Sequence, residues 1–419
     1  DEDEDGPLWR LTLYAAEGGA ASAIVYAANH AVSDQLSFNR VLSEILHVIA
    51  ELRAGREVGA PTALPLPPSV EGALLGKEQR QAEEIKERME LIIGAFGEAW
   101  GPEIGWRKWL PSWDAGRIRL ESIKYAFWQM AASGAKVLPT WVPDAEQIER
   151  EESKWQHMGR ATRNTFRTLD PDTTKALVKA CRARGVTASG ALCAAAVLGA
   201  SDVMGTVDNP EEPNSAQRYK LLQALDLRTL NFGAGEVDKP GARDDWSDGT
   251  VIAGTGSLDI LVDLPPEAGA AVRGGDIESF WRCASDCLGQ TREWISQGWG
   301  RESLLLFSSG WEFMNMNRVV ELGSQDRATL GRAYSAGVSN VGVYAHDIDH
   351  GDLALRRVYF GISQTVSAPA VSTSAVTVDG TLCLTTQYAT PVWGDQQAEA
   401  YADGLVRTLE LAAASAPAS

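Results

Sequence analysis

The sequence predicts an α/β protein organised in two halves, and three observations support this. In the first half, the apolar run of residues 23–28 precedes an amphipathic stretch over residues 34–54, as a buried strand precedes a helix. In the second half, residues 166–200 are typical of a strand, a capped helix, a glycine turn and a second helix. A strongly charged stretch, residues 142–160, indicates the connection between the halves.

The first half opens with two strands. Residues 8–14 favour a strand that pairs with residues 23–28 across a glycine-containing turn. The prolines of residues 60–70 predict an extended or irregular passage, because proline lacks the backbone donor. Residues 77–99 are charged and helix-prone, and residues 100–113 form a loop rich in Trp, Gly and Pro.

The second half carries clearer local signals. Asp170 before Pro171 predicts the start of a helix, and Gly185 predicts its end. The helix expected over residues 187–200 is so rich in alanine that it must pack closely against a sheet or another helix. The remaining expected elements are strands at 219–225, 252–264, 338–344, 356–366, 375–378 and 382–388, and helices at 276–296 and 395–413.

Composition limits the possible partners. With 38 basic and 56 acidic residues the chain has a net charge of -18, which argues against nucleic acid and anionic lipid as partners. The five cysteines show no metal-ligand spacing and fit a reducing compartment. The most apolar stretch, residues 188–200, is too short to span a bilayer. We therefore expect a cytoplasmic protein with no membrane span.

Residues 29–34 read Asn-His-Ala-Val-Ser-Asp and lie between the strand and the helix of the first half. A neutral imidazole takes a proton from a hydroxyl or amine near neutral pH when its ring is held in one tautomer. Four residues in a tight turn bring the Asp34 carboxylate back towards the backbone around His30, where it can brace the loop. Since strand ends in α/β folds are where reactive side chains meet ligands, the pattern predicts a buried general base at His30.

Four segments of the chain follow one another in a distinctive order. They are PLWRLTLY with NHAVSDQLSFNRVLSEIL, then LDPDTTKALVKACRARGVTASGALCAAA, then ALDLRTL, then VDGTLCLTTQYATPVWGDQQAEAYADGLVRTLELA. In this order they resemble the CoA-dependent acyltransferase superfamily, which includes chloramphenicol acetyltransferase, peptide-synthetase condensation domains, polyketide-associated acyltransferases and fungal trichothecene O-acetyltransferases. The resemblance implies a two-lobed chloramphenicol acetyltransferase-like fold, an α/β (α+β) arrangement with mixed sheets flanked by helices.

The resemblance also implies roles for individual residues. His30 matches the catalytic base that deprotonates the acceptor for direct attack on the thioester carbonyl. Asp34 matches the structural Asp of the motif, and Arg228 matches the Arg that pairs with it. Ser339 and Asn340 resemble the Ser/Thr-Asn-x-Gly strand that lines the reaction channel, and we expect them to be candidate oxyanion or channel donors.

The chain also departs from the family pattern. Asn29 replaces the first His of the usual pair, and Gln35 replaces the usual Gly after the Asp. Residues 297–300 imitate the Asp-Phe-Gly-Trp-Gly box of the plant branch, but we interpret them as a helix stop. Relatives place the His motif well inside the chain, so we expect a first lobe truncated at its N-terminus. The predicted domains are 1–160, the partial N-terminal lobe, and 161–419, the C-terminal lobe.

Two other features have ordinary explanations. Residues 346–350, His-Asp-Ile-Asp-His, are typical of a solvated turn between strands, so we expect no metal site there. Between residues 160 and 184 basic side chains outnumber acidic ones, in an otherwise acidic chain. A solvated helix face explains most of them, but the patch can also serve CoA phosphates, and its candidates are Arg160, Arg163, Lys175 and Lys179.

The function implied is that of an acyl-CoA-dependent O-acyltransferase, acetylating an alcohol of a secondary metabolite. Acyl-CoA is then a co-substrate, and we expect neither a tightly bound cofactor nor a metal, because one base and an oxyanion site suffice for this chemistry. Two alternatives stay open. One is a condensation-type domain that takes its acyl group from a carrier protein and forms an amide or ester. The other is a non-catalytic relative that only binds a ligand or partner.

Overall fold

The computed structural model describes residues 7–15, 22–59, 161–204, 217–229, 251–265, 267–296, 332–365, 367–390 and 392–417. They belong to two compact units, and each is described by itself. The first unit comprises Asp1–Lys77, Asp226–Thr255 and Val343–Arg356, and the second comprises Glu78–Leu225, Gly256–Gly342 and Arg357–Ser419. Several predicted features lie outside the described residues, namely the proline-rich passage, the helix at 77–99, the loop at 100–113, the connection at 142–160 with its domain boundary, and the helix stop at 297–300.

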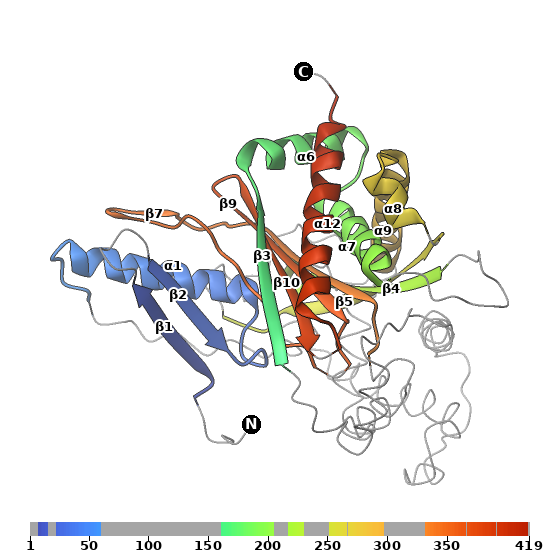
Figure 1. Cartoon of the computed structure of the whole chain (residues 1–419). Helices are drawn as coiled ribbons and strands as arrows, with labels where there is room; N and C mark the ends of the chain where they lie inside the picture. The colour runs from blue at the N-terminus through green and yellow to red at the C-terminus, as the bar shows by residue number, and fades with distance from the viewer. Residues whose placement is uncertain are drawn as a thin grey trace, which may run out of the picture. The chain divides into compact units, whose positions relative to one another are not determined.

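In the first unit, β1 (Trp9–Ala15) and β2 (Ser22–Ala28) form an antiparallel pair in which Leu11 lies opposite Tyr26. The predicted pairing of these strands is therefore confirmed. Helix α1 (Gln35–Arg53) follows β2 and lies along the pair in Figure 1. The Phe38 ring of α1 packs edge-on against the Tyr26 ring, with 5.0 Å between ring centroids. This aromatic contact fixes the helix against the strand that precedes it.

A short hairpin, β7 (Asp349–His350) and β8 (Leu353–Ala354), also belongs to the first unit. The turn predicted over residues 346–350 lies slightly later in the chain, because Asp349 and His350 form β7 and the turn is at Gly351 and Asp352. The prediction that these residues are solvated is wrong for His350, which is buried and whose Nε2 lies 3.0 Å from the Asp347 carbonyl oxygen. The hairpin folds back towards α1, where Arg53 pairs with Asp352.

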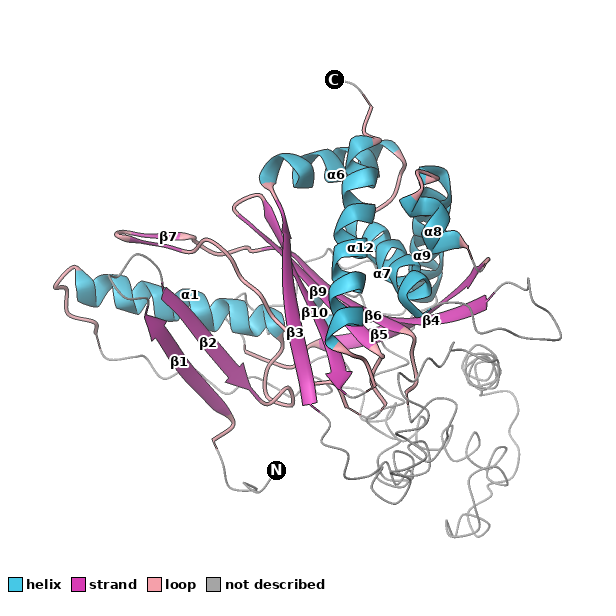
Figure 2. Cartoon of the chain, viewed as in Figure 1, coloured by secondary structure: helices cyan, strands magenta, loops and turns pink. Residues whose placement is uncertain are grey.

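The second unit is built on a six-stranded mixed sheet with the order β3-β10-β9-β6-β4-β5. Strand β10 pairs antiparallel with both β3 and β9, whereas β4 pairs parallel with β6. Figure 2 shows these strands as the magenta layer of the unit. The strands are β3 (Ala161–Leu169), β4 (Gln217–Asp226), β5 (Thr255–Leu264), β6 (Ala336–Val343), β9 (Val371–Val378) and β10 (Thr381–Thr390).

Helices gather over one face of this sheet (Figures 1 and 2). They are α6 (Pro171–Ala183), α7 (Ala188–Met204), α8 (Ala268–Arg273), α9 (Ile277–Ser296) and α12 (Asp395–Ala414). Residues 191–197 of α7 are at most 1 % exposed, so this helix is the centre of the core. A Cβ on Gly190 would stand 3.0 Å from the Ala284 carbonyl oxygen of α9, which confirms the close packing predicted from the alanine-rich sequence.

The predicted start and end of α6 were confirmed, whereas one predicted strand was wrong. Asp170 caps α6 by accepting a hydrogen bond from the Thr173 amide at 2.9 Å, and Gly185 takes a φ of +68° after the helix ends, as predicted. The strand expected at residues 356–366 is wrong, because described residues 356–365 belong to no strand. Their side chains are apolar enough for a strand, but no neighbouring strand pairs with them among the described residues. No single helix in the described ranges is both long and apolar enough to cross a membrane, although α6 and α7 pass that test as a bent pair.

Candidate functional site

The site begins where β2 ends. The Asn29 amide donates to the Leu8 carbonyl oxygen at 2.8 Å, which completes the ladder between β2 and the start of β1. The Asn29 side chain then accepts a hydrogen bond from the Ala31 amide at 2.9 Å and closes a turn. Asn suits this place because its short side chain bonds readily to the backbone two residues on. The turn presents His30 directly after the strand.

His30 is exposed, which differs from the buried base that the sequence indicated. The turn over residues 29–32 carries the imidazole outward, while the next residues, Ser33 and Asp34, are each 2 % exposed. The His30 Nδ1 atom lies 3.0 Å from the Ser33 carbonyl oxygen. A carbonyl oxygen only accepts, so this contact requires the proton on Nδ1. In the neutral imidazole the other ring nitrogen, Nε2, then keeps its lone pair and can accept a proton.

Asp34 performs two structural tasks. As the N-cap of α1, it accepts a hydrogen bond from the Ser37 amide at 3.0 Å, and this bond satisfies one of the first amides of the helix. Its carboxylate also receives both terminal nitrogens of Arg228, at 2.7 and 2.9 Å, in a bidentate pair. The Gly254 amide donates a further hydrogen bond at 2.8 Å. The carboxylate oxygens face these donors, so the role of Asp34 is to hold the loop in place.

Arg228 reaches Asp34 from a 3-10 turn, Leu227–Thr229, that follows β4 directly. Its side chain is 19 % exposed, against 2 % for the Asp34 side chain. The guanidinium also lies 3.2 Å from an Asp226 oxygen and donates to the Ser37 hydroxyl at 3.0 Å. A Cβ on Gly254 would stand 2.9 Å from the nearer guanidinium nitrogen, so a larger residue there would displace the Arg228 side chain from this position.

These contacts determine the ionisation of Asp34, Arg228 and Asp226. Burial alone raises the pKa of Asp34, but the hydrogen bonds and charge of Arg228 and the amides of Ser37 and Gly254 outweigh it, so the pKa of Asp34 is lowered. Burial lowers the pKa of Arg228, yet its bonds to Asp34 and Asp226 raise it overall. The pKa of Asp226 is raised because desolvation is its largest influence. The Asp34–Arg228 pair is therefore a buried ion pair.

Sequence reasoning did not find Ser37 and residues 252–254. The Ser37 hydroxyl donates to the Ile252 carbonyl oxygen at 2.9 Å and accepts from the Ile252 amide at 3.0 Å. The Asp34 amide donates to the same carbonyl oxygen at 3.1 Å. The spacing of Asp34 and Ser37 signals a helix N-cap, but no sequence pattern connects them to residues more than 200 positions away.

The other predicted residues belong to the second unit. Ser339 and Asn340 are half-buried on β6. The Asn340 side chain donates to the Ser189 hydroxyl and accepts from the Gly342 amide, both at 3.0 Å. These bonds hold the amide in one orientation. The role of both residues as oxyanion or channel donors stays a prediction.

The basic patch is less available than its sequence indicated. Arg160 lies outside the described residues. Arg163 pairs with Asp395 at 2.6 Å, so part of its charge is neutralised. Lys175 and Lys179 are exposed on α6. Among the residues that the structure describes, no three His, Cys, Asp or Glu side chains are grouped closely enough to hold a metal ion.

No protein-family model and no curated protein matches this chain. Among solved structures, TRI3 trichothecene 15-O-acetyltransferase from Fusarium sporotrichioides matches with a TM-score of 0.59 and 11% identity, over 97% of this chain and 70% of that one. The chain has the chloramphenicol acetyltransferase-like fold. The acyltransferase-type fold that the sequence resemblance predicted is thereby confirmed.

Two more solved structures match with lower TM-scores. Polyketide synthase associated protein 5 from Mycobacterium tuberculosis gives a TM-score of 0.49 at 15% identity, over 95% of this chain and 76% of that one. The epimerization domain from the third module of tyrocidine synthetase B gives 0.48 at 14% identity, over 96% and 71%. At 11% identity the match to TRI3 trichothecene 15-O-acetyltransferase shows the fold alone.

Proposed function

We propose that this chain is an acyl-CoA-dependent O-acyltransferase in which His30 is the general base. The observation that carries the proposal is the contact between His30 Nδ1 and the Ser33 carbonyl oxygen at 3.0 Å. It fixes the tautomer whose exposed Nε2 accepts a proton, which is the state that a base for an alcohol needs. The buried Asp34–Arg228 pair keeps the loop behind the imidazole in one conformation.

The proposed reaction is a direct transfer. The acceptor hydroxyl gives its proton to His30 Nε2 while its oxygen attacks the thioester carbonyl carbon, and a tetrahedral oxyanion forms. The carbon–sulfur bond then breaks, the ester leaves, and the CoA thiolate recovers the proton from the imidazolium. Ser339 and Asn340 are our proposed donors to the oxyanion, a contribution that is worth about 3–4 kcal/mol where such donors have been removed. Asp34 acts on the geometry of the loop and takes no proton.

The test is an acyl-transfer assay on the chain with acetyl-CoA and a panel of simple and terpenoid alcohols, followed by release of free thiol. We expect release that depends on the alcohol and is lost in His30→Ala. His47→Ala is the matched control, because His47 is an exposed histidine on α1 of the same unit, and it should retain full activity. Equal rates in the wild type and His30→Ala, with alcohol present, would contradict the proposal.

The same assay separates the two alternatives. A condensation-type domain should give no thiol release from acetyl-CoA, but should consume an acyl group loaded on a carrier protein. A binding-only relative should turn over neither donor, while acetyl-CoA still raises its melting temperature by binding the folded state. His30→Ala should leave that stabilisation unchanged.

A further inference from the structure

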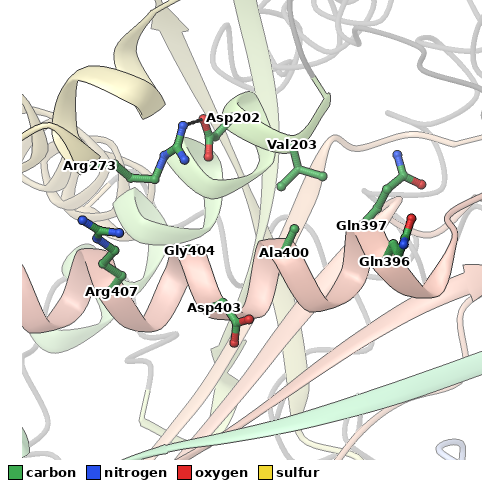
Figure 3. A pocket seen from close by; sticks show the side chains of 9 residues that line it. All are labelled: Asp202, Val203, Arg273, Gln396, Gln397, Ala400, Asp403, Gly404 and Arg407. Atoms are coloured by element: carbon green, nitrogen blue, oxygen red, sulfur yellow. Dashed lines mark hydrogen bonds and ion pairs between the residues drawn. The ribbon is translucent and has the colours of Figure 1, made fainter.

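A pocket of about 490 Å³ lies in the second unit between the ends of α7 and α8 and one face of α12. Its volume is within the range that small-molecule sites occupy. It contains none of the residues that the proposed acyl transfer uses, and Figure 3 shows its side chains. Its lining combines an apolar floor with cationic and amide side chains at its ends.

The floor is open because α12 carries small residues there. Ala400 and Gly404 are one helical turn apart on α12, and Val203 of α7 faces them (Figure 3). A Cβ placed on Gly404 would meet no atom within 4 Å, so the space over this residue belongs to the pocket. Between Gln396 and Arg407 the helix axis advances about 16 Å, so the pocket suits an elongated molecule.

Positive charge is concentrated at one end. Arg407 and Arg273 lie together there in Figure 3, with Arg273 bonded to Asp202. Among the described residues Arg407 forms no ion pair, although the chain as a whole is strongly acidic. The remaining carboxylate, Asp403, points away from the pocket, and it accepts a hydrogen bond from Arg167 at 2.7 Å. The Arg407 end therefore offers guanidinium donors to an oxyanion.

The other end offers amide groups. Gln396 and Gln397 stand there, and the Gln397 Oε1 atom accepts a hydrogen bond from the Gly394 amide at 2.9 Å. That bond orients the side chain and leaves its amide nitrogen as a donor. A ligand with an oxyanion and a short aliphatic body fits this lining. The oxyanion binds the Arg407 guanidinium, and the aliphatic body covers Val203 and Ala400.

We infer that this pocket is a second binding site, which takes a small elongated molecule with a carboxylate or phosphate held by Arg407 and an aliphatic body over Ala400 and Gly404. The two oxyanions share one recognition chemistry, because guanidinium groups bind both through charge-assisted hydrogen bonds. The site is distinct from the acyl-transfer site, so its occupancy should not depend on His30.

The test titrates the whole chain with n-hexanoate, n-hexyl phosphate and n-hexylammonium by isothermal titration calorimetry. We expect saturable binding of at least one anion and none of the cation. The anion that binds identifies the source as a carboxylate or a phosphate. Arg407→Gln should weaken binding by about tenfold or more, since it removes a charge-assisted contact. His30→Ala should bind as the wild type does.

Gly404→Leu gives an independent test, because a Cβ at this position meets no protein atom within 4 Å and the rest of a leucine side chain would occupy the pocket. It should abolish binding while leaving the melting temperature unchanged or higher, as leucine favours a helix more than glycine does. The matched controls are Arg182→Gln, an exposed arginine on α6, and Gly289→Leu, an exposed glycine within α9 whose Cβ would also meet nothing within 4 Å. Both should keep the affinity within about twofold.

The inference would be overturned by absence of binding by both anions, by equal binding of the ammonium compound, or by an affinity that Arg407→Gln and Gly404→Leu leave unchanged. Binding that survives Gly404→Leu but disappears in His30→Ala would place the anion in the acyl-transfer site and would equally reject the second site. The proposed acyl transfer is untouched by any of these outcomes, because its assay measures thiol release.

Discussion

Replacing Arg228 by methionine should destabilise the first unit strongly. The Asp34 carboxylate has four close donors, two guanidinium nitrogens of Arg228 and the amides of Ser37 and Gly254. Arg228→Met removes the first two and leaves a carboxylate at 2 % exposure without a counter-charge. Removing one partner of a buried ion pair costs about 3–5 kcal/mol, and we expect a loss of free energy of unfolding in that range at neutral pH.

The measurement is urea denaturation followed by circular dichroism and tryptophan fluorescence. Arg53→Met is the matched control, since the Arg53–Asp352 pair lies in the same unit but both side chains are more than half exposed. Water screens such a pair, so this variant should unfold at nearly the wild-type urea concentration. The double variant Asp34→Leu with Arg228→Met should be more stable than Arg228→Met alone, because it buries no unpaired charge.

Two results would refute this reasoning. If Arg228→Met and Arg53→Met shifted the urea midpoint equally, burial would not increase the contribution of the Asp34–Arg228 pair to stability. If the cost of the double variant equalled the sum of the costs of Asp34→Leu and Arg228→Met, the two residues would be energetically independent.

Three further outcomes follow from the same structure. Gly254→Ala places a Cβ 2.9 Å from a guanidinium nitrogen of Arg228 and should cost about 1–3 kcal/mol in urea denaturation, whereas Gly59→Ala, whose Cβ meets nothing within 4 Å, should cost far less. Because the folded-state pKa of Asp34 is lowered, its contribution to stability is present above the unfolded pKa of about 3.9 and is lost as the pH falls through the folded pKa. The gap in unfolding free energy between wild type and Asp34→Asn should therefore narrow as the pH falls below about 4, and a constant gap would contradict this. Burial raises the pKa of the Cys181 thiol to about 11, so Ellman's reagent should leave that thiol unmodified in the folded protein and react after unfolding, as peptide mapping can check.

Signals contained in a few neighbouring residues predicted the local structure well. Asp170 capping α6 and Gly185 ending it depend on chemistry within one turn of chain, so the sequence alone was sufficient. The pairing of Asp34 with Arg228 required the order of segments that the family resemblance supplied, because 194 positions separate the two residues. Local pattern alone contains no information about such a distance.

The failures have the same origin. Residues 356–365 have strand-like composition, but a strand also needs a partner, and composition does not specify one. The burial of His350 depends on how a hairpin folds against α1, and the exposure of His30 depends on the direction of a turn. The Ser37 hydroxyl contacts only backbone atoms of Ile252, so the residue type at position 252 could not predict these contacts.

The hydrogen bonds of Asp34 to distant residues also constrain the order in which the protein folds. Its guanidinium partner is 194 residues further along the chain and its amide partner Gly254 is 220 residues further. Loops of that length close late, because contacts of high sequence separation cost chain entropy before they return any energy. A chain synthesised only to residue 200 therefore lacks both Arg228 and Gly254, the distant partners that hold Asp34. Amide hydrogen exchange at Gly254 during refolding would report when the loop that carries His30 becomes fixed by its bonds to Asp34.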